Sequence, residues 1–147
     1  MPSRTGRQLA ALGNCAVYSG GRNCVTAAGG LSGVLNALLA TAEAGEDVIV
    51  TDPTYAGLLN RVRLAGGVPR QVPFRFNPRG EWRLDRDALS ATIGPGVRAI
   101  LLMSSSMPSG GALDADDLAL VAQLCTRHDL LLILTAPWNG CFSMRAR

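Results

Sequence analysis

Residues 24–52, CVTAAGGLSGVLNALLATAEAGEDVIVTD, contain the pattern that decides the fold. From Leu31 to Ala42, apolar residues recur at i, i+3, i+4, i+7, i+8 and i+11, which predicts an amphipathic helix. A short apolar segment, Cys24–Ala27, precedes the helix and reads as a strand. Gly45 ends the helix, and Asp47–Thr51 reads as a second strand. A strand, a helix and a strand in this order predict two strands running in parallel.

The same alternation continues toward the C-terminus. A helix is expected from Tyr55 to Val62, followed by an alternating strand over residues 68–76. Pro69 and Pro73 cannot donate ladder hydrogen bonds, so we expect this strand at a sheet edge. Asn77–Gly80 reads as a turn.

The next elements expected are a short helix over residues 85–93 and an apolar strand over residues 97–103. Asp114 can cap a further helix, whose expected buried face is Leu118, Val121, Ala122 and Cys125. The last element is an apolar strand, Leu130–Leu134, which we expect to leave an open sheet edge. Continuously apolar strands alternating with helices indicate an α/β fold with a mostly parallel sheet and helices on both faces.

Composition narrows the class of protein. The chain has 147 residues, 48% hydrophobic and 17% charged, which suits one globular domain or a piece of one. The net charge of +3 comes from scattered arginines, so no nucleic-acid partner is expected. No apolar run approaches the roughly 20 residues that span a bilayer, and we expect a cytoplasmic protein with no membrane partner. Four cysteines without metal spacing and a single histidine predict no metal site.

Three loops could carry chemistry. The glycine turn Ala28–Gly33 lies before a helix, whose free N–H groups and dipole favour a phosphate; an ordinary tight turn is the alternative. Tyr55, in the loop Asp52–Tyr55, can stack on a flat ligand at the carboxyl edge of the sheet or pack under its helix. The polar loop Ser104–Gly110 follows a buried strand, where ligands bind in open α/β sheets.

In this order and spacing, the motifs resemble those of the class I and II aminotransferases, fold-type-I enzymes that use pyridoxal 5'-phosphate. The resemblance covers roughly residues 22–133 and includes most of the family's ordered motifs. Their counterparts in this chain are Gly29-Gly30, Ala44–Val48, Asp52–Tyr55, Ala65–Pro69 and Met107–Gly110.

The resemblance implies an incomplete fold-type-I large domain over residues 22–133, preceded by a weakly patterned segment, residues 1–21. It implies that the backbone of Gly30, Leu31 and Ser32 holds the cofactor phosphate and that Tyr55 stacks on the pyridine ring. The implied substrates are an amino acid and a 2-oxo acid, and the family is usually homodimeric.

Several departures from the family pattern count against activity of this chain alone. Met107 stands where the family has an asparagine, Thr135 where it has an aspartate, and Trp138 where it has a tyrosine. All 14 residues counted as Lys plus Arg are arginines, so the family's Schiff-base lysine has no counterpart. We therefore expect no catalytic residue here, no covalent attachment of the cofactor to a side chain, and a chain that is inactive alone.

Two other functions remain open. The chain could be a non-catalytic remnant or an interaction module that keeps part of the fold. It could also bind a dinucleotide, because Asp52 lies 22 positions after Gly30, where a ribose-binding acid is expected. However, Gly29, Gly30 and Gly33 do not have the Gly-x-Gly-x-x-Gly spacing.

The tail, residues 134–147, does not resemble the family, and we interpret it as the product of a shifted reading frame. Codons can be chosen for it so that a start at the third base of the Leu134 codon encodes Asp-Gly-Ala-Met-Glu-Arg-Leu-Leu-Phe-Asp-Ala-Arg. The peptide from the shifted frame restores the aspartate that the family has where this chain has Thr135. Reading the gene's nucleotides tests the hypothesis: we expect a second frame that continues the family pattern, and its absence would refute the shift.

Overall fold

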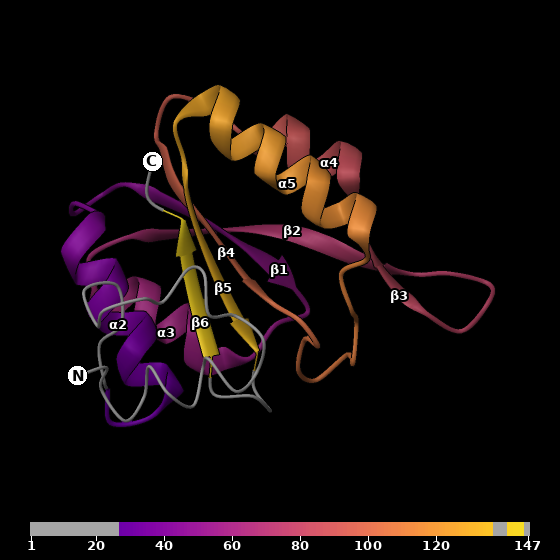
Figure 1. Ribbon diagram of the computed structural model, residues 1–147, viewed down its shortest axis with the longest axis horizontal. Helices are drawn as coiled ribbons and strands as arrows, with labels where there is room; N and C mark the ends of the chain where they lie inside the picture. Colours follow the sequence, from indigo (N-terminus) through magenta and orange to yellow (C-terminus); the bar gives the residue numbers. More distant parts are fainter. Residues whose placement is uncertain (1–26, 137–140, 146–147) are drawn as a thin grey trace, which may run out of the picture.

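The computed structural model describes residues 27–136 and 141–145. The strand expected at Cys24–Ala27 and the segment 1–21 therefore lie outside the described residues, apart from Ala27 itself. Within the described part, the helices and strands alternate as the sequence predicts (Figure 1).

A six-stranded sheet forms the centre of the fold, in the order β3-β2-β1-β4-β5-β6. β2, β1, β4 and β5 run in parallel, and the short strands β3 and β6 pair antiparallel at the two ends. The mostly parallel sheet is thus confirmed. The strands are β1 Asp47–Asp52, β2 Val68–Phe76, β3 Trp82–Leu84, β4 Val97–Met103, β5 Leu131–Ala136 and β6 Cys141–Arg145.

Helices cover both faces of the sheet, also as predicted (Figure 1). One pair is α2, Gly30–Thr41, and α3, Ala56–Leu64; the other is α4, Arg86–Thr92, and α5, Ala115–His128. Along β1 the side chains alternate between the two layers. Val48 and Val50 pack with α2 and α3, whereas Ile49 packs with α4 and α5.

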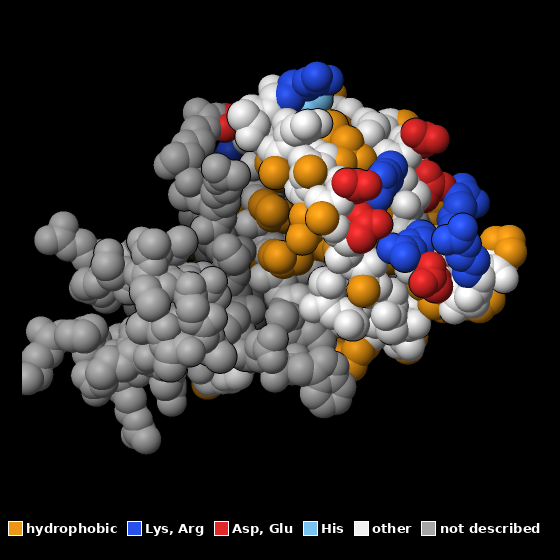
Figure 2. All heavy atoms as spheres, turned by 45° about the vertical axis from the view of Figure 1, so that its right-hand side comes forward, with side chains coloured by type: hydrophobic (Ala, Val, Ile, Leu, Met, Phe, Trp, Pro, Cys, Tyr) orange, Lys and Arg blue, Asp and Glu red, His pale blue; other side chains and the backbone are white. Residues whose placement is uncertain are grey.

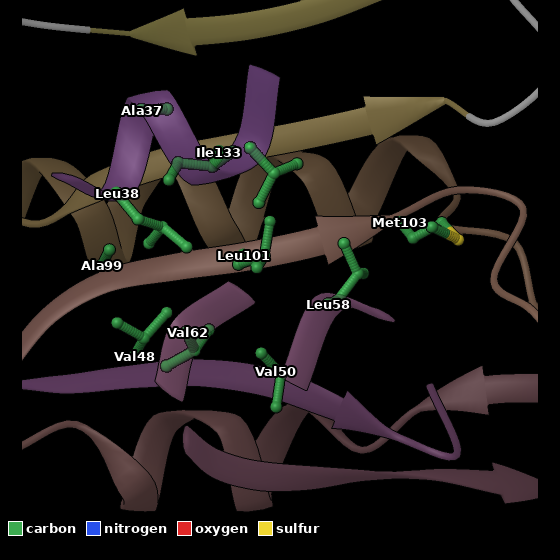
Figure 3. Close-up of a cluster of buried hydrophobic side chains, with 11 residues drawn as sticks. Ala37, Leu38, Val48, Val50, Leu58, Val62, Ala99, Leu101, Met103 and Ile133 are labelled. Atoms are coloured by element: carbon green, nitrogen blue, oxygen red, sulfur yellow. The ribbon is translucent and has the colours of Figure 1, made fainter. Parts of the chain in front are cut away.

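Each layer encloses its own apolar core. Figure 3 shows the one beneath α2 and α3, where Leu38, Leu58 and Val62 meet Leu101 and Ile133 from β4 and β5. All five side chains are at most 1% exposed. Burying an aliphatic side chain of this size stabilises a fold by about 1.5–3 kcal/mol. This core therefore fixes both helices against the sheet.

The two ends of the sheet differ in part from the predictions. β3 pairs with β2 only from Phe74 to Phe76, so Pro69 has β1 as its one strand neighbour, in keeping with a proline near an edge. The sequence pattern missed β3, which has only three residues. The open edge expected at residues 130–134 is wrong, because β6 pairs with β5.

The buried face of α5 also differs from the prediction. Leu118 is 38% exposed, and the buried residues are Asp117, Val121 and Leu124. The reason is electrostatic: the Asp117 carboxylate accepts a hydrogen bond from Arg86 at 2.7 Å and another from the backbone N–H of Asp114 at 3.1 Å. A buried carboxylate with these donors is satisfied, so a polar residue lies on the buried face, which the prediction had built from apolar residues and cysteine alone.

Asp114 is the centre of an ionic network at the start of α5. Its carboxylate accepts from the Asp117 N–H at 2.8 Å, completing a capping box, and pairs with Arg86 at 3.0 Å and Arg83 at 3.1 Å. Figure 2 shows acidic and basic side chains gathered on this side of the molecule. The Asp117 N–H, followed by the charges of Arg86 and Arg83, lowers the pKa of the Asp114 carboxyl.

We predict that Asp114→Ala lowers the urea midpoint, because the helix loses its cap, and that Asp114→Asn keeps most of the cap but loses the charge. Since the native pKa of Asp114 is depressed, its ionised form stabilises the fold above the unfolded pKa of about 3.9. That stability disappears as pH falls through the folded pKa. The Asn variant should therefore lose less stability than the wild type below about pH 4.

Urea unfolding at several pH values measures this difference. Asp116→Asn, in the same helical turn but not at the cap, is the matched control. Equal acid sensitivity of the wild type and Asp114→Asn would contradict the account.

Candidate functional site

The loops that follow β1 and β4 meet at one edge of the sheet. Because these strands are parallel, both loops leave from the carboxyl side. The hydroxyl of Ser106, buried with 1% exposure, donates to the carbonyl of Pro53 at 3.3 Å. The backbone N–H of Ser104 donates to the carbonyl of Thr135 in β5 at 3.1 Å. The structure thus joins the ends of three strands by direct hydrogen bonds.

The loop after β4 is held by hydrogen bonds within the loop and by close packing on the β2–β3 hairpin. The Ser106 N–H donates to the Gly111 carbonyl, and the Gly110 N–H to the Ser106 carbonyl, each at 2.7 Å. A Cβ at Gly111 would lie 3.0 Å from the ring of Phe74 and 3.1 Å from Cβ of Trp82. The backbone therefore rests closely on the β2–β3 hairpin, and a side chain at this position would lift it.

The start of α2 offers unshared backbone donors. The first helical bond runs from the Gly33 N–H to the Gly29 carbonyl at 3.1 Å, which leaves the N–H groups of Gly30, Leu31 and Ser32 without a helical acceptor. Gly29 has φ 92° and ψ 165°, a conformation essentially restricted to glycine.

This turn fits a phosphate. No acidic residue lies in the first turn of α2, so no carboxylate competes for the donors. A Cβ placed on Gly29 would meet nothing within 4 Å, so there is room beside the Cα of Gly29. Leu31, in the first turn of α2, packs against the same apolar cluster as Met107 of the loop after β4.

Tyr55 lies at the carboxyl side of β1, where it is the N-cap residue of α3. Its side chain is 40% exposed and does not belong to either apolar core. The two readings of this residue, a ring that stacks on a ligand and a ring packed against its helix, both remain open. The ring lies at the surface, where a flat ligand can reach it.

Met107 does not offer a polar atom to a ligand's hydroxyl as an asparagine would. It is partly buried and packs against the apolar cluster beneath α2 and α3. A thioether sulfur is at best a weak acceptor and cannot donate a hydrogen bond. Met107 therefore contributes packing to this loop.

The described residues hold few other reactive groups. Burial raises the pKa of the Cys125 thiol to about 11, so it is protonated near neutral pH and is a poor nucleophile. No three His, Cys, Asp or Glu side chains within residues 27–136 come together as a metal site. Nor does any helix in the part of the chain that the structure describes have the length and apolarity to cross a bilayer.

Two surface hollows lie away from these residues. One is bounded by α5 at Ala122 and Thr126, and another lies between the β2–β3 hairpin and Ser109. Neither is lined by Gly30, Leu31, Ser32 or Tyr55. The candidate site lies at the edge of the sheet where β1 and β4 end. It is identified by backbone donors and an exposed aromatic ring.

Comparison with known proteins identifies the class of this fold and site. The model of the family "Aminotransferase class I and II" matches residues 8–135. Kynurenine–oxoglutarate transaminase 3 of Mus musculus is 28% identical over 116 residues, which cover 74% of this chain and 26% of that protein. A probable N-succinyldiaminopimelate aminotransferase of Mycobacterium tuberculosis is 31% identical over 105 residues, covering 71% of this chain and 26% of that protein.

Solved structures agree. N-succinyldiaminopimelate aminotransferase from Mycobacterium tuberculosis superposes with a TM-score of 0.69 at 30% identity, covering 72% of this chain and 27% of that one. Aromatic aminotransferase from Pyrococcus horikoshii OT3 gives 0.66 at 32% identity, with 72% and 28% covered.

The chain belongs to the class I and II aminotransferases, a family that uses pyridoxal 5'-phosphate. Its fold is an incomplete fold-type-I large domain, as the sequence motifs implied. The chain spans about a quarter of the length of the relatives that it matches.

We predict that Ser106→Ala destabilises the protein by about 1–3 kcal/mol, because the Pro53 carbonyl loses the donor that ties it to the loop after β4. Equilibrium urea unfolding measures the change. Ser90→Ala is the matched control, since the exposed Ser90 hydroxyl bonds only to Arg86 of its own helix. Equal stability of the two variants would show that the link between the loops contributes nothing.

Proposed function

We propose that this chain binds pyridoxal 5'-phosphate at the carboxyl edge of its sheet. The N–H groups of Gly30, Leu31 and Ser32 bind the phosphate, and Tyr55 stacks on the pyridine ring. The observation that carries the proposal is the start of α2, where three backbone donors have no helical acceptor and follow a glycine whose Cβ direction is unobstructed. Helix starts of this kind favour phosphate through both hydrogen bonds and the helix dipole.

Each residue has a separate task in this proposal. The N–H groups at the start of α2 bind the negatively charged phosphate, and Tyr55 sets the plane of the pyridine ring. Ser106 holds the loop after β4 against the loop after β1, which fixes the floor of the site. When bound, the cofactor acts as an electron sink for the carbon that carries the amino group.

The chain cannot complete an aminotransferase site by itself. The family attaches its cofactor to a lysine amine, and none of the 147 residues is lysine. We therefore propose that the cofactor binds this chain without a covalent bond to a side chain. We propose also that transfer of an amino group between an amino acid and a 2-oxo acid requires polypeptide that these residues do not include.

A second candidate is a non-catalytic cofactor-binding remnant. The packing of Met107 favours it, because the structure puts an apolar contact at a position where the family has a polar one. We propose a cytoplasmic location, because no apolar run of the sequence is long enough to span a bilayer, and formation of a homodimer, because the family resemblance implies one.

We predict that Gly29→Ala weakens binding of pyridoxal 5'-phosphate about tenfold or more. An L side chain at φ 92° and ψ 165° costs about 1–3 kcal/mol, and relaxing this strain turns the N–H groups away from the phosphate. A ³¹P NMR titration measures the dissociation constant.

Gly80→Ala is the matched control. Gly80 has φ 83° and equally open surroundings, but it lies in the turn between β2 and β3. The Gly80→Ala substitution should lower the free energy of unfolding by an amount similar to Gly29→Ala. It should leave binding of pyridoxal 5'-phosphate unchanged. If both variants weaken binding alike, or if the wild type does not bind, the proposed phosphate site is wrong.

A further inference from the structure

The ring of Tyr55 lies on the backbone of its own helix. Gly57 is the second residue of α3, and a Cβ built on it would collide with Cε1 of Tyr55. It would also lie 3.0 Å from Cδ1 and from Cζ, so it would meet one whole side of the ring. The absence of a side chain at Gly57 makes room for the aromatic ring.

The helix itself does not need glycine at this position. Gly57 lies within α3 and has no positive φ, unlike Gly29, Gly45, Gly66, Gly80 and Gly110. Glycine is a poorer helix former than alanine, because it loses more backbone freedom on folding. The contact with Tyr55 is therefore the feature of the structure that accounts for glycine here.

The two buried cores do not hold the ring. Tyr55 is 40% exposed and does not belong to either apolar core. The single aromatic pair of the described residues is Phe76 with Trp82, on the β2–β3 hairpin. The ring position thus depends on the short-range contact with Gly57, at the point where β1 ends and α3 begins.

We propose that Gly57 is a positioning residue for the cofactor. Its bare backbone supports the Tyr55 ring, so that the ring stands at the carboxyl edge of β1 ready to stack on the pyridine ring. This inference rests on the proposed function, since it gives Tyr55 a ligand. It adds that residue 57, two positions after Tyr55, determines how well the tyrosine ring stacks on the pyridine ring.

The test is Gly57→Ala in the 147-residue chain, with two probes. Affinity for pyridoxal 5'-phosphate should fall about three- to tenfold, the range expected when an aromatic stack is misplaced. Affinity for inorganic phosphate should stay unchanged, because the start of α2 is intact. The melting temperature should hold or rise, because alanine favours the helix. Gly94→Ala is the control, since a Cβ there meets nothing within 4 Å.

A double-mutant cycle separates positioning from a general effect on the fold. With Tyr55→Ala as the background, Gly57→Ala should not change the affinity any further. A loss that persists without the tyrosine ring would overturn the proposal, as would unchanged affinity in the single variant.

NMR distinguishes failure of this inference from failure of the proposed function. A nuclear Overhauser contact between the Tyr55 ring and the Gly57 α-protons is expected in the free chain. If the wild type binds the cofactor but Gly57→Ala binds it equally well, only the positioning role is wrong. If the contact is present and the wild type binds neither probe, the proposed function fails, and the positioning role fails with it.

Discussion

The site depends on the parallel pairing of β1, β4 and β5. In a parallel sheet every strand ends on the same side, so the residues after Asp52 and Met103 leave from one edge, at which β5 also ends. An antiparallel β4 would send its loop to the opposite end of the molecule. The hydrogen bonds from Ser104 and Ser106 to neighbouring loops and strands exist because the pairing already brings these backbones together.

Packing then determines where α2 starts. Leu38 is fully buried against the sheet, and Leu31, the second residue of the helix, packs on the same cluster as Met107. The helix axis is therefore fixed by apolar contacts, whereas its first N–H groups stay at the edge. The hydrophobic face that stabilises the fold and the polar end that can bind an anion belong to one helix. A substitution in the core would affect both.

Sequence patterns predicted those elements whose structure follows from local periodicity. The helix over residues 31–42 and the strand over residues 97–103 have long apolar patterns, and both are present. β3 was not predicted from the sequence, because three residues are too few to show an alternating pattern. Its pairing with β2 depends on the hairpin turn. The face of α5 was misassigned because Arg86, 31 residues before Asp117, satisfies a buried carboxylate. The sequence also suggested a ligand-facing role for Tyr55, but the ring's contact with Gly57 required coordinates.

The central claim is that the start of α2 and Tyr55 together bind pyridoxal 5'-phosphate. Amide and aromatic chemical-shift mapping during a titration with the cofactor tests it most directly. The account predicts that the shifts concentrate at Gly30, Leu31, Ser32 and the ring of Tyr55. Shifts confined to the β2–β3 hairpin and α5, or none at saturating cofactor, would contradict it.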